Sequence, residues 1–340
     1  MIIKNEEVKK ILIIKFRALG DILLSVPAMR AVKESYPGAR LSVLVNRHGE
    51  EILEGLSFID EVLVFDKTIG YPVSRDLDLI LNVMDNKYDL VIDMYGNLRS
   101  ALLAFLSGAK YRVGLSSRSR NLFYNIVVAG SPGIIYNPEV WLRVASAAGV
   151  SGAGGRPSIL LGREEESYIS AFMMEEGLIA GKFVVLNPFA SAVTREWPRA
   201  NYVELAMLLV KSGLAAVIVW GPGQEKEARA IKAACGKDVI IAPQTGIKQL
   251  GWLLKKSAVV VTGTTFIQHL AVAVGANVVS IFGATDSRAW VDPAYEKQTV
   301  LQAKLDCMPC EKVKCQDLRC MDQISVLKVD SALRKYINRA

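Results

Sequence analysis

Short apolar runs alternate along the chain with longer segments whose apolar residues recur at helical spacing. In the first half the strand candidates are residues 11–15, 41–45, 62–65 and 90–93, with helical patterns such as 100–106 between them. A second series follows residue 157, with strand candidates at 183–186, 215–220, 239–242, 258–261 and 278–282. Apolar strands that alternate with helices are typical of parallel sheets covered by helices. The pattern therefore predicts an α/β fold.

The two series are separated by a glycine-rich stretch from Gly149 to Pro157 that has the composition of a linker. A chain of 340 residues is long enough for two domains with full cores. We expect two Rossmann-like, doubly wound parallel-sheet domains, residues 1–155 and 156–340, facing a central cleft that holds the active site.

The composition is that of a globular protein, with 51% hydrophobic and 22% charged residues. The most apolar stretch, residues 205–220, is interrupted by Lys211 and Gly213. It falls short of the roughly 18 uninterrupted apolar residues of a membrane span. The first residues also lack the pattern of a signal peptide. We therefore expect a cytoplasmic protein.

A net charge of +7 indicates an anionic partner, such as a nucleic acid, a phosphorylated small molecule or the inner face of a membrane. The sequence has no run of five basic residues and no basic motif with interleaved aromatic residues. This argues against a dedicated DNA- or RNA-binding protein. The net charge does not choose between the other two partners.

The first apolar strand ends in a glycine turn with a carboxylate, Gly20-Asp21, and a helical pattern follows. Ligands of open α/β sheets bind at this end of the strands, so Asp21 is a candidate for chemistry. An aspartate at a helix start also caps the helix in proteins of any function, and this role stays open. No G-x-G-x-x-G motif follows the strand, which argues against a nicotinamide-dependent dehydrogenase.

Two loops of the second half carry charged candidates. Arg195 lies just before a helix that Pro198 can start, where a guanidinium can bind phosphate through two parallel hydrogen bonds. The alternative is a surface arginine beside a packing residue, Trp197. Glu225 follows a glycine-proline turn at another helix start, where a carboxylate can bind ribose hydroxyls or cap the helix.

Two further turns carry small and polar residues. Thr264 and Thr265 precede a helix whose N-terminal amides, together with the two hydroxyls, can bind a diphosphate. His269 lies on the first turns of that helix, where a half-buried structural histidine is the alternative. Gly283 lies in the turn after the last strand candidate and allows a close approach of backbone.

Taken in order along the chain, these motifs resemble one family. They are Lys15-x-Arg17-Ala-Leu-Gly-Asp21, Asp93–Ser100, Leu122–Asn125, Arg195–Pro198, Trp220–Glu225, His269–Ala271 and Phe282–Asp286. The chain is similar over nearly its whole length to the ADP-heptose:lipopolysaccharide heptosyltransferases of glycosyltransferase family 9. The resemblance implies a GT-B glycosyltransferase that needs no cofactor or metal for catalysis. It also implies that the N-terminal domain binds the acceptor and the C-terminal domain the nucleotide sugar.

The roles of single residues are implied by the same resemblance. Asp21 matches the general base of an inverting transfer, and Arg195, where the family usually has lysine, matches the cation on the leaving diphosphate. Glu225 matches the carboxylate that binds ribose. The other implied donor-binding residues are Thr264, Thr265, His269 and Gly283.

The resemblance also implies an acceptor site made of arginines in the first domain. They are Arg17, Arg47, Arg99, Arg118 and Arg120. In the family such residues meet the acidic sugars and phosphates of a lipopolysaccharide precursor, which would hold the enzyme against the inner face of the cytoplasmic membrane as a peripheral protein. The alternative for each arginine is a solvated surface charge.

One motif departs from the family. The usual Asp-Thr-Gly before the histidine is replaced by Thr264-Thr265-Phe266, which removes a carboxylate aimed at the sugar and puts a ring where glycine allows close approach. The donor implied by the resemblance is ADP-heptose. The alternatives are another nucleotide sugar used for a different surface glycan, and a non-catalytic relative that acts as a binding or scaffold protein.

Four cysteines lie close together near the C-terminus. They are Cys307, Cys310, Cys315 and Cys320. In a cytosolic chain four thiols within fourteen residues indicate a structural zinc or iron site, with free or redox-active thiols as the alternative. Because the cluster is far in sequence from the candidate loops, we assign it to stability. The sequence leaves open whether the last helix returns to the N-terminal domain.

Overall fold

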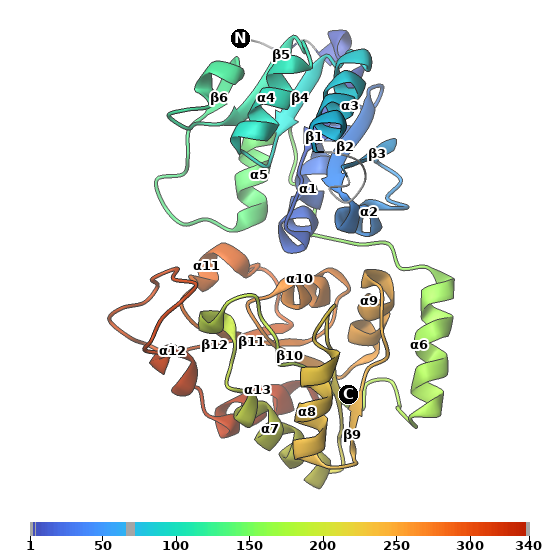
Figure 1. Cartoon of the computed structure of the whole chain (residues 1–340), viewed down its shortest axis with the longest axis vertical. Helices are drawn as coiled ribbons and strands as arrows, with labels where there is room; N and C mark the ends of the chain where they lie inside the picture. The colour runs from blue at the N-terminus through green and yellow to red at the C-terminus, as the bar shows by residue number, and fades with distance from the viewer. Residues whose placement is uncertain (1–2, 4, 66–71, 338–340) are drawn as a thin grey trace. The chain divides into compact units, whose positions relative to one another are not determined.

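Two parallel six-stranded sheets form the centre of the protein, one in each half of the chain (Figure 1). The computed structural model describes residues 3, 5–65 and 72–337. The chain divides into two units, residues 1–160 and 161–340, and each unit is described here by itself.

The sheet of the N-terminal unit has the strand order β3-β2-β1-β4-β5-β6, and all neighbours are parallel. Its strands are β1 (Lys10–Ile14), β2 (Arg40–Asn46), β3 (Glu61–Phe65), β4 (Leu90–Asp93), β5 (Tyr111–Leu115) and β6 (Ile126–Val128). Ile13 of β1 lies opposite Val43 on one side and Ile92 on the other. These central strands are almost fully buried, which explains their continuous apolar sequences.

Helices cover this sheet in two groups. They are α1 (Leu19–Ser35), α2 (Arg47–Leu53), α3 (Pro72–Asp85), α4 (Leu98–Leu106) and α5 (Asn137–Ser146), with two short 3₁₀ helices, η1 (Asn5–Glu7) and η2 (Asn121–Phe123). Helix α1 packs against α2 and α5, whereas α3 packs against α4 and α4 against η2. Leu12 and Ile14 of β1 share a core with Leu103 and Ala104 of α4.

The sheet of the C-terminal unit has the order β12-β11-β10-β7-β8-β9, again with only parallel neighbours. Its strands are β7 (Phe183–Asn187), β8 (Ala215–Ile218), β9 (Val239–Ile241), β10 (Val259–Gly263), β11 (Val278–Phe282) and β12 (Gln298–Gln302). When the strands of each unit are counted from its start, both sheets have the order 3-2-1-4-5-6, which is that of the Rossmann fold. The order reverses between β1 and β4 in the first unit, and between β7 and β10 in the second.

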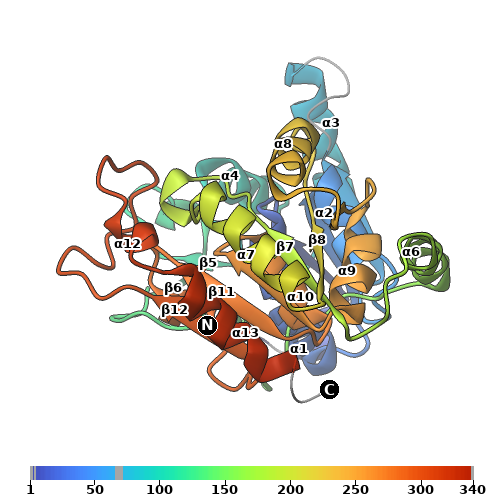
Figure 2. The same cartoon turned by 90° about the horizontal axis from the view of Figure 1, so that it is seen from below.

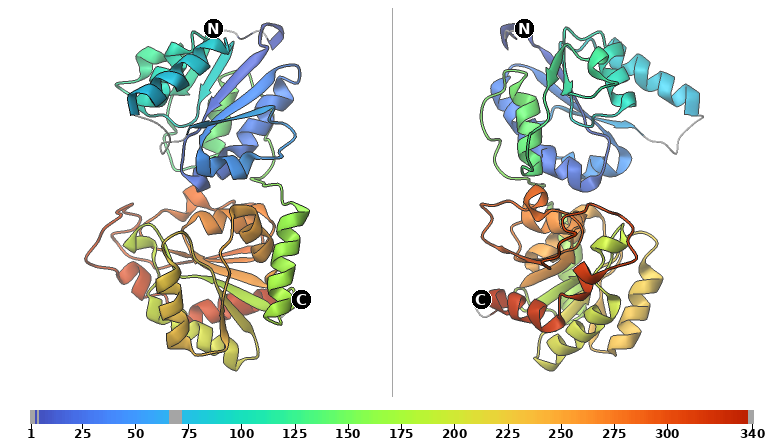
Figure 3. Two further views of the ribbon diagram at one scale, coloured as in Figure 1. Left: turned by 45° about the vertical axis from the view of Figure 1, so that its right-hand side comes forward. Right: turned by 90° about the vertical axis from the view of Figure 1, so that its left-hand side faces the viewer.

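The helices of the C-terminal unit are α6 (Arg163–Glu175), α7 (Arg199–Lys211), α8 (Glu225–Cys235), α9 (Ile247–Lys256), α10 (Phe266–Ala273), α11 (Ser287–Trp290), α12 (Arg319–Asp322) and α13 (Val326–Ile337), with the 3₁₀ helix η3 (Val193–Arg195). Helix α6 packs against α9 (Figure 3). The last helix, α13, packs against α7, β10 and β11 of the same unit (Figure 2). Its buried residues Val329 and Leu333 join the core that contains Trp197.

The glycine-rich stretch that resembles a linker in sequence is bound to helix α1. Arg30 of α1 donates hydrogen bonds to the carbonyl of Gly154 at 3.0 Å and to Ser158 Oγ at 2.7 Å. Gly154 has a φ of +59°, and a Cβ there would lie 1.7 Å from the carbonyl oxygen of Pro27. Gly154 therefore serves close packing on α1, and the two units divide at residues 160 and 161.

No helix in the described part of the chain is long and apolar enough to cross a membrane.

Candidate functional site

The carboxyl ends of β1 and β4 flank the point where the strand order of the N-terminal unit reverses, which is where open α/β sheets bind ligands. Asp21 lies there as the third residue of α1, and its Oδ2 accepts a hydrogen bond from the backbone N–H of Ala18 at 3.3 Å. The capping role considered from the sequence is therefore present. The described residues make no second hydrogen bond to this half-buried carboxylate, so it has an oxygen free to accept a proton.

A buried cation lies beneath this turn. Lys15 follows β1 and is 2% exposed. Its Nζ donates to the carbonyl of Met94 at 2.9 Å and lies 3.7 Å from the centre of the Trp141 ring. Burial lowers the pKa of Lys15 to about 8, against the opposing attraction of Asp21 and Asp93. Asp21 and Asp93, the carboxylates of the switch point, are thus close enough to attract this ammonium group.

Asp93, at the end of β4, is fully buried and shapes the next loop. Its Oδ1 accepts hydrogen bonds from the backbone N–H groups of Tyr95 and Gly96, both at 2.9 Å, and its Oδ2 accepts from the hydroxyl of Tyr124 at 2.6 Å. Burial and this carboxylate raise the pKa of Tyr124 well above its ordinary value. Asp93 therefore acts here as an anchor for the loop.

Three predicted arginines gather around that loop. Arg17 Nε donates to the hydroxyl of Tyr95 at 2.7 Å. The guanidinium of Arg99 stacks 4.0 Å from the centre of the Phe65 ring. Arg120 lies over Gly96, and its buried Nε has no hydrogen-bond partner among the described residues. Three guanidinium groups are therefore placed around one loop at the carboxyl end of β4.

The other two predicted arginines follow neighbouring strands of the same sheet. Arg47 is the first residue of α2, directly after β2, and Arg118 is exposed in the loop after β5. Because the strands are parallel, both residues belong to the same edge of the sheet as Asp21.

The corresponding edge of the C-terminal unit holds the loop with Arg195. Two strand-end glycines allow this loop to lie directly on the sheet. A Cβ on Gly263, at the end of β10, would lie 2.2 Å from the carbonyl oxygen of Arg195, and a Cβ on Gly283, after β11, would lie 2.0 Å from that of Thr194. The glycines thus position the half-buried Arg195 at the switch point between β7 and β10.

A hydroxyl and amide cluster lies beside this loop. Asn187 Nδ2, at the end of β7, donates to the Oγ1 atoms of Thr262 at 2.9 Å and Thr265 at 3.2 Å. Thr265 caps α10 by accepting from the backbone N–H of Ile267. The buried Oγ1 of Thr264 has no hydrogen-bond partner among the described residues, so this atom can bind a ligand.

His269 is buried on α10, with its ring 5.8 Å from that of Trp290. Burial lowers the pKa of His269 to about 4. The imidazole is therefore neutral near pH 7 and can serve as a hydrogen-bonding group, while the positive charge of this edge comes from Arg195.

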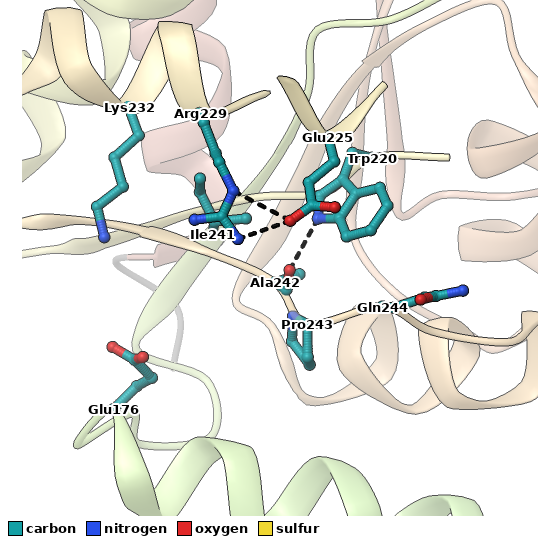
Figure 4. A pocket seen from close by; sticks show the side chains of 9 residues that line it. All are labelled: Glu176, Trp220, Glu225, Arg229, Lys232, Ile241, Ala242, Pro243 and Gln244. Atoms are coloured by element: carbon teal, nitrogen blue, oxygen red, sulfur yellow. Dashed lines mark hydrogen bonds and ion pairs between the residues drawn. The ribbon is translucent and has the colours of Figure 1, made fainter. Parts of the chain in front are cut away.

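A polar cavity of about 330 Å³ lies at the carboxyl ends of β8 and β9 (Figure 4). Glu225, the first residue of α8, lies in its wall and accepts hydrogen bonds from Arg229 Nε at 3.0 Å and Nη2 at 2.6 Å. The indole of Trp220 donates to the carbonyl of Ala242 at 2.9 Å, which fixes the ring at the cavity wall. The complete lining is Glu176, Trp220, Glu225, Arg229, Lys232, Ile241, Ala242, Pro243 and Gln244.

The cysteine segment is far from the candidate loops in sequence but packs on them in space. The backbone N–H groups of Cys310 and Glu311 donate to the carbonyl of Ala284, both at 3.0 Å. Thr194 Oγ1 donates to the carbonyl of Lys312 at 2.6 Å. This segment therefore braces both the turn after Gly283 and the loop that carries Arg195.

The four thiols differ in exposure, from Cys307 at the surface to buried Cys320. Burial raises the pKa of Cys320, and the nearby thiols of Cys310, Cys307 and Cys315 raise it further. Within the described ranges no group of three or more His, Cys, Asp or Glu side chains is arranged to hold a metal ion. The metal site stays a prediction, since the described segment would have to close around an ion.

Lys15, Asp93 and Asn187 are three functional positions that the sequence did not reveal, although Lys15 and Asp93 lie within motifs that resemble the family. The available signal was a polar side chain at the end of each apolar run, directly before the loop. All three are buried and bind the site's backbone or side chains rather than facing solvent.

Comparison with known proteins identifies the family. The model of glycosyltransferase family 9 (heptosyltransferase) matches residues 77–320. Lipopolysaccharide heptosyltransferase 1 of Salmonella typhimurium is 25% identical over 299 residues, covering 82% of this chain and 89% of that protein.

Solved structures agree in fold. The glycosyl transferase family 9 protein of Veillonella parvula matches with a TM-score of 0.84 at 18% identity, over 98% of both chains. Escherichia coli heptosyltransferase WaaC with ADP-2-deoxy-2-fluoro heptose matches with a TM-score of 0.71 at 19% identity, over 96% of this chain and 99% of that chain. The predicted fold class, two Rossmann-like parallel-sheet domains of the GT-B type, is confirmed. The chain belongs to glycosyltransferase family 9, the heptosyltransferase family.

Proposed function

We propose that this enzyme transfers heptose from ADP-heptose to the inner core of a lipopolysaccharide precursor, with inversion at the anomeric carbon. The observation that carries the proposal is Asp21, a carboxylate with a free oxygen at the switch point of the N-terminal sheet. The names of the relatives support the substrates, since they include a lipopolysaccharide heptosyltransferase and a heptosyltransferase with an ADP-linked fluoroheptose.

In the proposed reaction Asp21 takes the proton of the acceptor hydroxyl as that oxygen forms its bond to the anomeric carbon. The bond between this carbon and the diphosphate oxygen breaks on the opposite face, and ADP leaves with the electron pair. Lys15 and Asp93 do not touch the reacting atoms: Lys15 holds a positive charge beneath the base, and Asp93 fixes the next loop.

Three groups of the C-terminal unit would hold the donor. The cavity beside Glu225 suits a nucleoside, with the carboxylate exchanging its bonds to Arg229 for ribose hydroxyls. Arg195 would stabilise the charge that develops on the diphosphate. The free hydroxyl of Thr264 and the neutral imidazole of His269 would bind phosphate or sugar oxygens.

The arginines of the N-terminal unit would hold the acceptor. Arg17, Arg99 and Arg120 surround the loop after β4, next to the turn with Asp21. Guanidinium groups bind phosphates and carboxylates through paired hydrogen bonds, which suits the acidic inner core. Arg47 and Arg118 would extend this site along the same sheet edge.

A second candidate is a family 9 transferase with another nucleotide sugar. It is favoured by Thr264 and Phe266, which supply a hydroxyl and a ring where the family usually has a carboxylate and a glycine. A hydroxyl can donate a hydrogen bond to the sugar, whereas a carboxylate only accepts one. The two candidates share the chemistry of Asp21 and differ in the donor.

Calorimetric titration of the purified protein with ADP-heptose and with ADP-, UDP- and GDP-linked hexoses tests the proposal. We expect selective binding of ADP-heptose, unchanged donor affinity in Asp21→Ala, and loss of transfer in that variant. Preference for another nucleotide sugar would favour the second candidate. A protein that binds none of the donors, or in which Asp21→Ala keeps wild-type transfer, would contradict the catalytic proposal.

We also propose a structural zinc or iron ion at Cys307, Cys310, Cys315 and Cys320. The support is the proximity of the other three thiols to Cys320. When bound, such an ion would join the cysteine segment into one unit and would take no part in the transfer.

A further inference from the structure

Large apolar side chains are exposed on one side of the N-terminal unit. Apart from Leu160 at the end of the unit, the exposed large apolar side chains among its described residues all lie between positions 77 and 134, on α3, α4, η2, β6 and the loop after β6. Helices α1, α2 and α5, which form the other packed group, expose none in their described side chains. The exposure is therefore a property of one side of the unit rather than of its surface in general.

The centre of this side is formed by α4 and η2. Leu98, Leu102 and Phe105 follow one another at the spacing i, i+4, i+7, so they form a single stripe along α4. Leu122 of η2 is 88% exposed, and its neighbour Phe123 contacts Phe105 edge-on at 5.9 Å. We call Leu98, Leu102, Phe105 and Leu122 the α4–η2 surface. Helix α3 lies beside α4 and adds the exposed residues Leu77, Leu81 and Met84.

Basic residues dominate the segment that carries the α4–η2 surface, where Lys110 is ion-paired with Glu7 from outside the segment. Residues 94–138 contain five basic residues and no acidic residue. Arg112 lies against the surface, with its guanidinium 5.7 Å from the centre of the Phe105 ring and its Nε donating to the carbonyl of Phe123. Helix α3 carries Asp78 and Asp85. The combination of apolar and basic side chains is thus centred on α4 and η2, with α3 at its margin.

The apolar and basic side chains of the α4–η2 surface indicate which partner it binds. A second copy meeting the first through the same surface would bring two basic, acid-free segments together. An anionic lipid surface would complement the charge, and its headgroup boundary accepts exposed leucine and phenylalanine side chains. We propose that the α4–η2 surface docks this enzyme on an anionic membrane.

The proposal rests on the proposed function in one respect. It assumes that the acceptor is a lipopolysaccharide precursor, which is itself a lipid. Leu98 of the α4–η2 surface is the neighbour in sequence of Arg99, which stacks on Phe65 at the candidate acceptor site. Docking through α4 therefore brings the arginines at the carboxyl edge of the sheet close to the lipid headgroups. The apolar side chains anchor the enzyme, and the arginines remain available for the sugar part of the acceptor.

Co-sedimentation with vesicles tests the docking surface. The full chain is compared with a triple variant, Leu102→Gln/Phe105→Gln/Leu122→Gln, on phosphatidylcholine vesicles with and without phosphatidylglycerol. We expect the wild type to bind the anionic vesicles, and added salt to weaken its binding. The triple variant should bind about tenfold more weakly, because the buried apolar area supplies much of the affinity.

A matched control replaces three apolar residues of the C-terminal unit that are just as exposed, Met174→Gln/Ile179→Gln/Leu327→Gln. We expect it to bind as the wild type does. If the triple variant unfolds, Leu122→Gln alone keeps the test valid, because that side chain faces solvent and its loss should still weaken binding by a measurable factor.

Two outcomes would overturn the proposal: equal vesicle binding by the wild type and the triple variant, or a wild type that does not bind anionic vesicles. A dimer that the triple variant dissociates, with vesicle binding unchanged, would assign the surface to a second copy. Transfer to a delipidated, soluble acceptor separates this proposal from the proposed function. There the triple variant should keep the wild-type rate, whereas failure of the proposed function would abolish transfer in every variant.

Discussion

Replacing Gly283 with alanine tests whether the sheet end positions the loop that carries Arg195. A Cβ at this position would lie 2.0 Å from the carbonyl oxygen of Thr194, whereas real Cβ atoms essentially never come closer than 3.0 Å to a neighbour. The loop would have to withdraw by about 1 Å. It cannot do so freely, because Thr194 Oγ1 donates a hydrogen bond to the carbonyl of Lys312.

The expected effect follows from this displacement. A misplacement of about 1 Å costs about a hundredfold in rate when it moves a group that stabilises the transition state. Overpacking of the strand end should also reduce the free energy of unfolding by about 1–3 kcal/mol. We expect kcat of Gly283→Ala to fall about a hundredfold at saturating donor, measured by release of the nucleoside diphosphate, with a smaller change in KM for the acceptor. Gly263→Ala, which would meet the carbonyl of Arg195 at 2.2 Å, should act in the same direction.

Gly38→Ala is the matched control, because no heavy atom lies within 4 Å of a Cβ at that position. It should change the free energy of unfolding by no more than about 0.5 kcal/mol and leave kcat unchanged. A Gly283→Ala enzyme with wild-type kcat would refute the reasoning. So would a variant whose activity falls only in proportion to its unfolded fraction, since the loop would then not be positioned by this glycine.

Three further predictions concern the C-terminal unit. Glu225→Gln should weaken binding of ADP by about tenfold in calorimetry, because a neutral amide binds ribose hydroxyls less strongly than a carboxylate. The control Glu204→Gln, at an exposed position of α7, should leave the affinity for ADP unchanged. Equal affinities of Glu225→Gln and the wild type for ADP would exclude a ribose contact of Glu225. Burial lowers the pKa of His269 to about 4. As the pH falls, the unfolded state therefore takes up a proton on this histidine below about pH 6.5, whereas the folded state does so only near pH 4. The free energy of unfolding should fall over this pH range by up to about 3 kcal/mol. The free energy of unfolding, measured with urea at several pH values, should change less with pH in His269→Gln than in the wild type or in the control His48→Gln, which replaces an exposed residue. An equal pH dependence in all three proteins would contradict the burial argument. Elemental analysis should find about one zinc or iron ion per chain in the wild type and none in a variant with all four C-terminal cysteines changed to serine, whereas a metal-free wild type would contradict the structural site.

Most of the strands that could be predicted from the sequence are fully buried, and the half-buried β3 and β9 could be predicted as well because their sequences are apolar runs. In a parallel sheet covered on both faces fully buried strands are continuous apolar runs, as in β1 and β10. The sequence analysis missed β5, β6 and β12, in which polar or half-exposed residues such as Arg112 and Gln298 interrupt the run. β6 and β12 are also edge strands with less burial, so their sequences carry less signal.

The glycine-rich stretch shows a second limit of sequence reasoning. Composition cannot distinguish a glycine that confers freedom from one that permits contact, and Gly154 is of the second kind because it packs on the carbonyl of Pro27. The same holds for Gly263 and Gly283. Their role depends on a loop distant in sequence, so only the folded arrangement reveals it.

The site residues divide in the same way. The positions of Asp21 and Glu225 could be predicted, because a carboxylate that follows a strand and its turn lies at the start of the next helix. Lys15 could not, since a lysine at the end of an apolar strand is ordinarily the first exposed residue. Only the structure reveals that Trp141 and the carbonyl of Met94, both from distant segments, enclose its ammonium group.

The role of the cysteine segment is the one that the contacts in the structure revise most. It was assigned to stability because it lies far along the chain from the candidate loops, yet its backbone binds Ala284 and Thr194 on either side of the predicted donor site. A segment that supplies these hydrogen bonds cannot loosen without releasing the turn after Gly283 and the loop of Arg195. Stability of this segment and geometry of the donor site are therefore one property of the C-terminal unit. Disorder introduced at the cysteines should appear first as weaker donor binding, before the core around Trp197 unfolds.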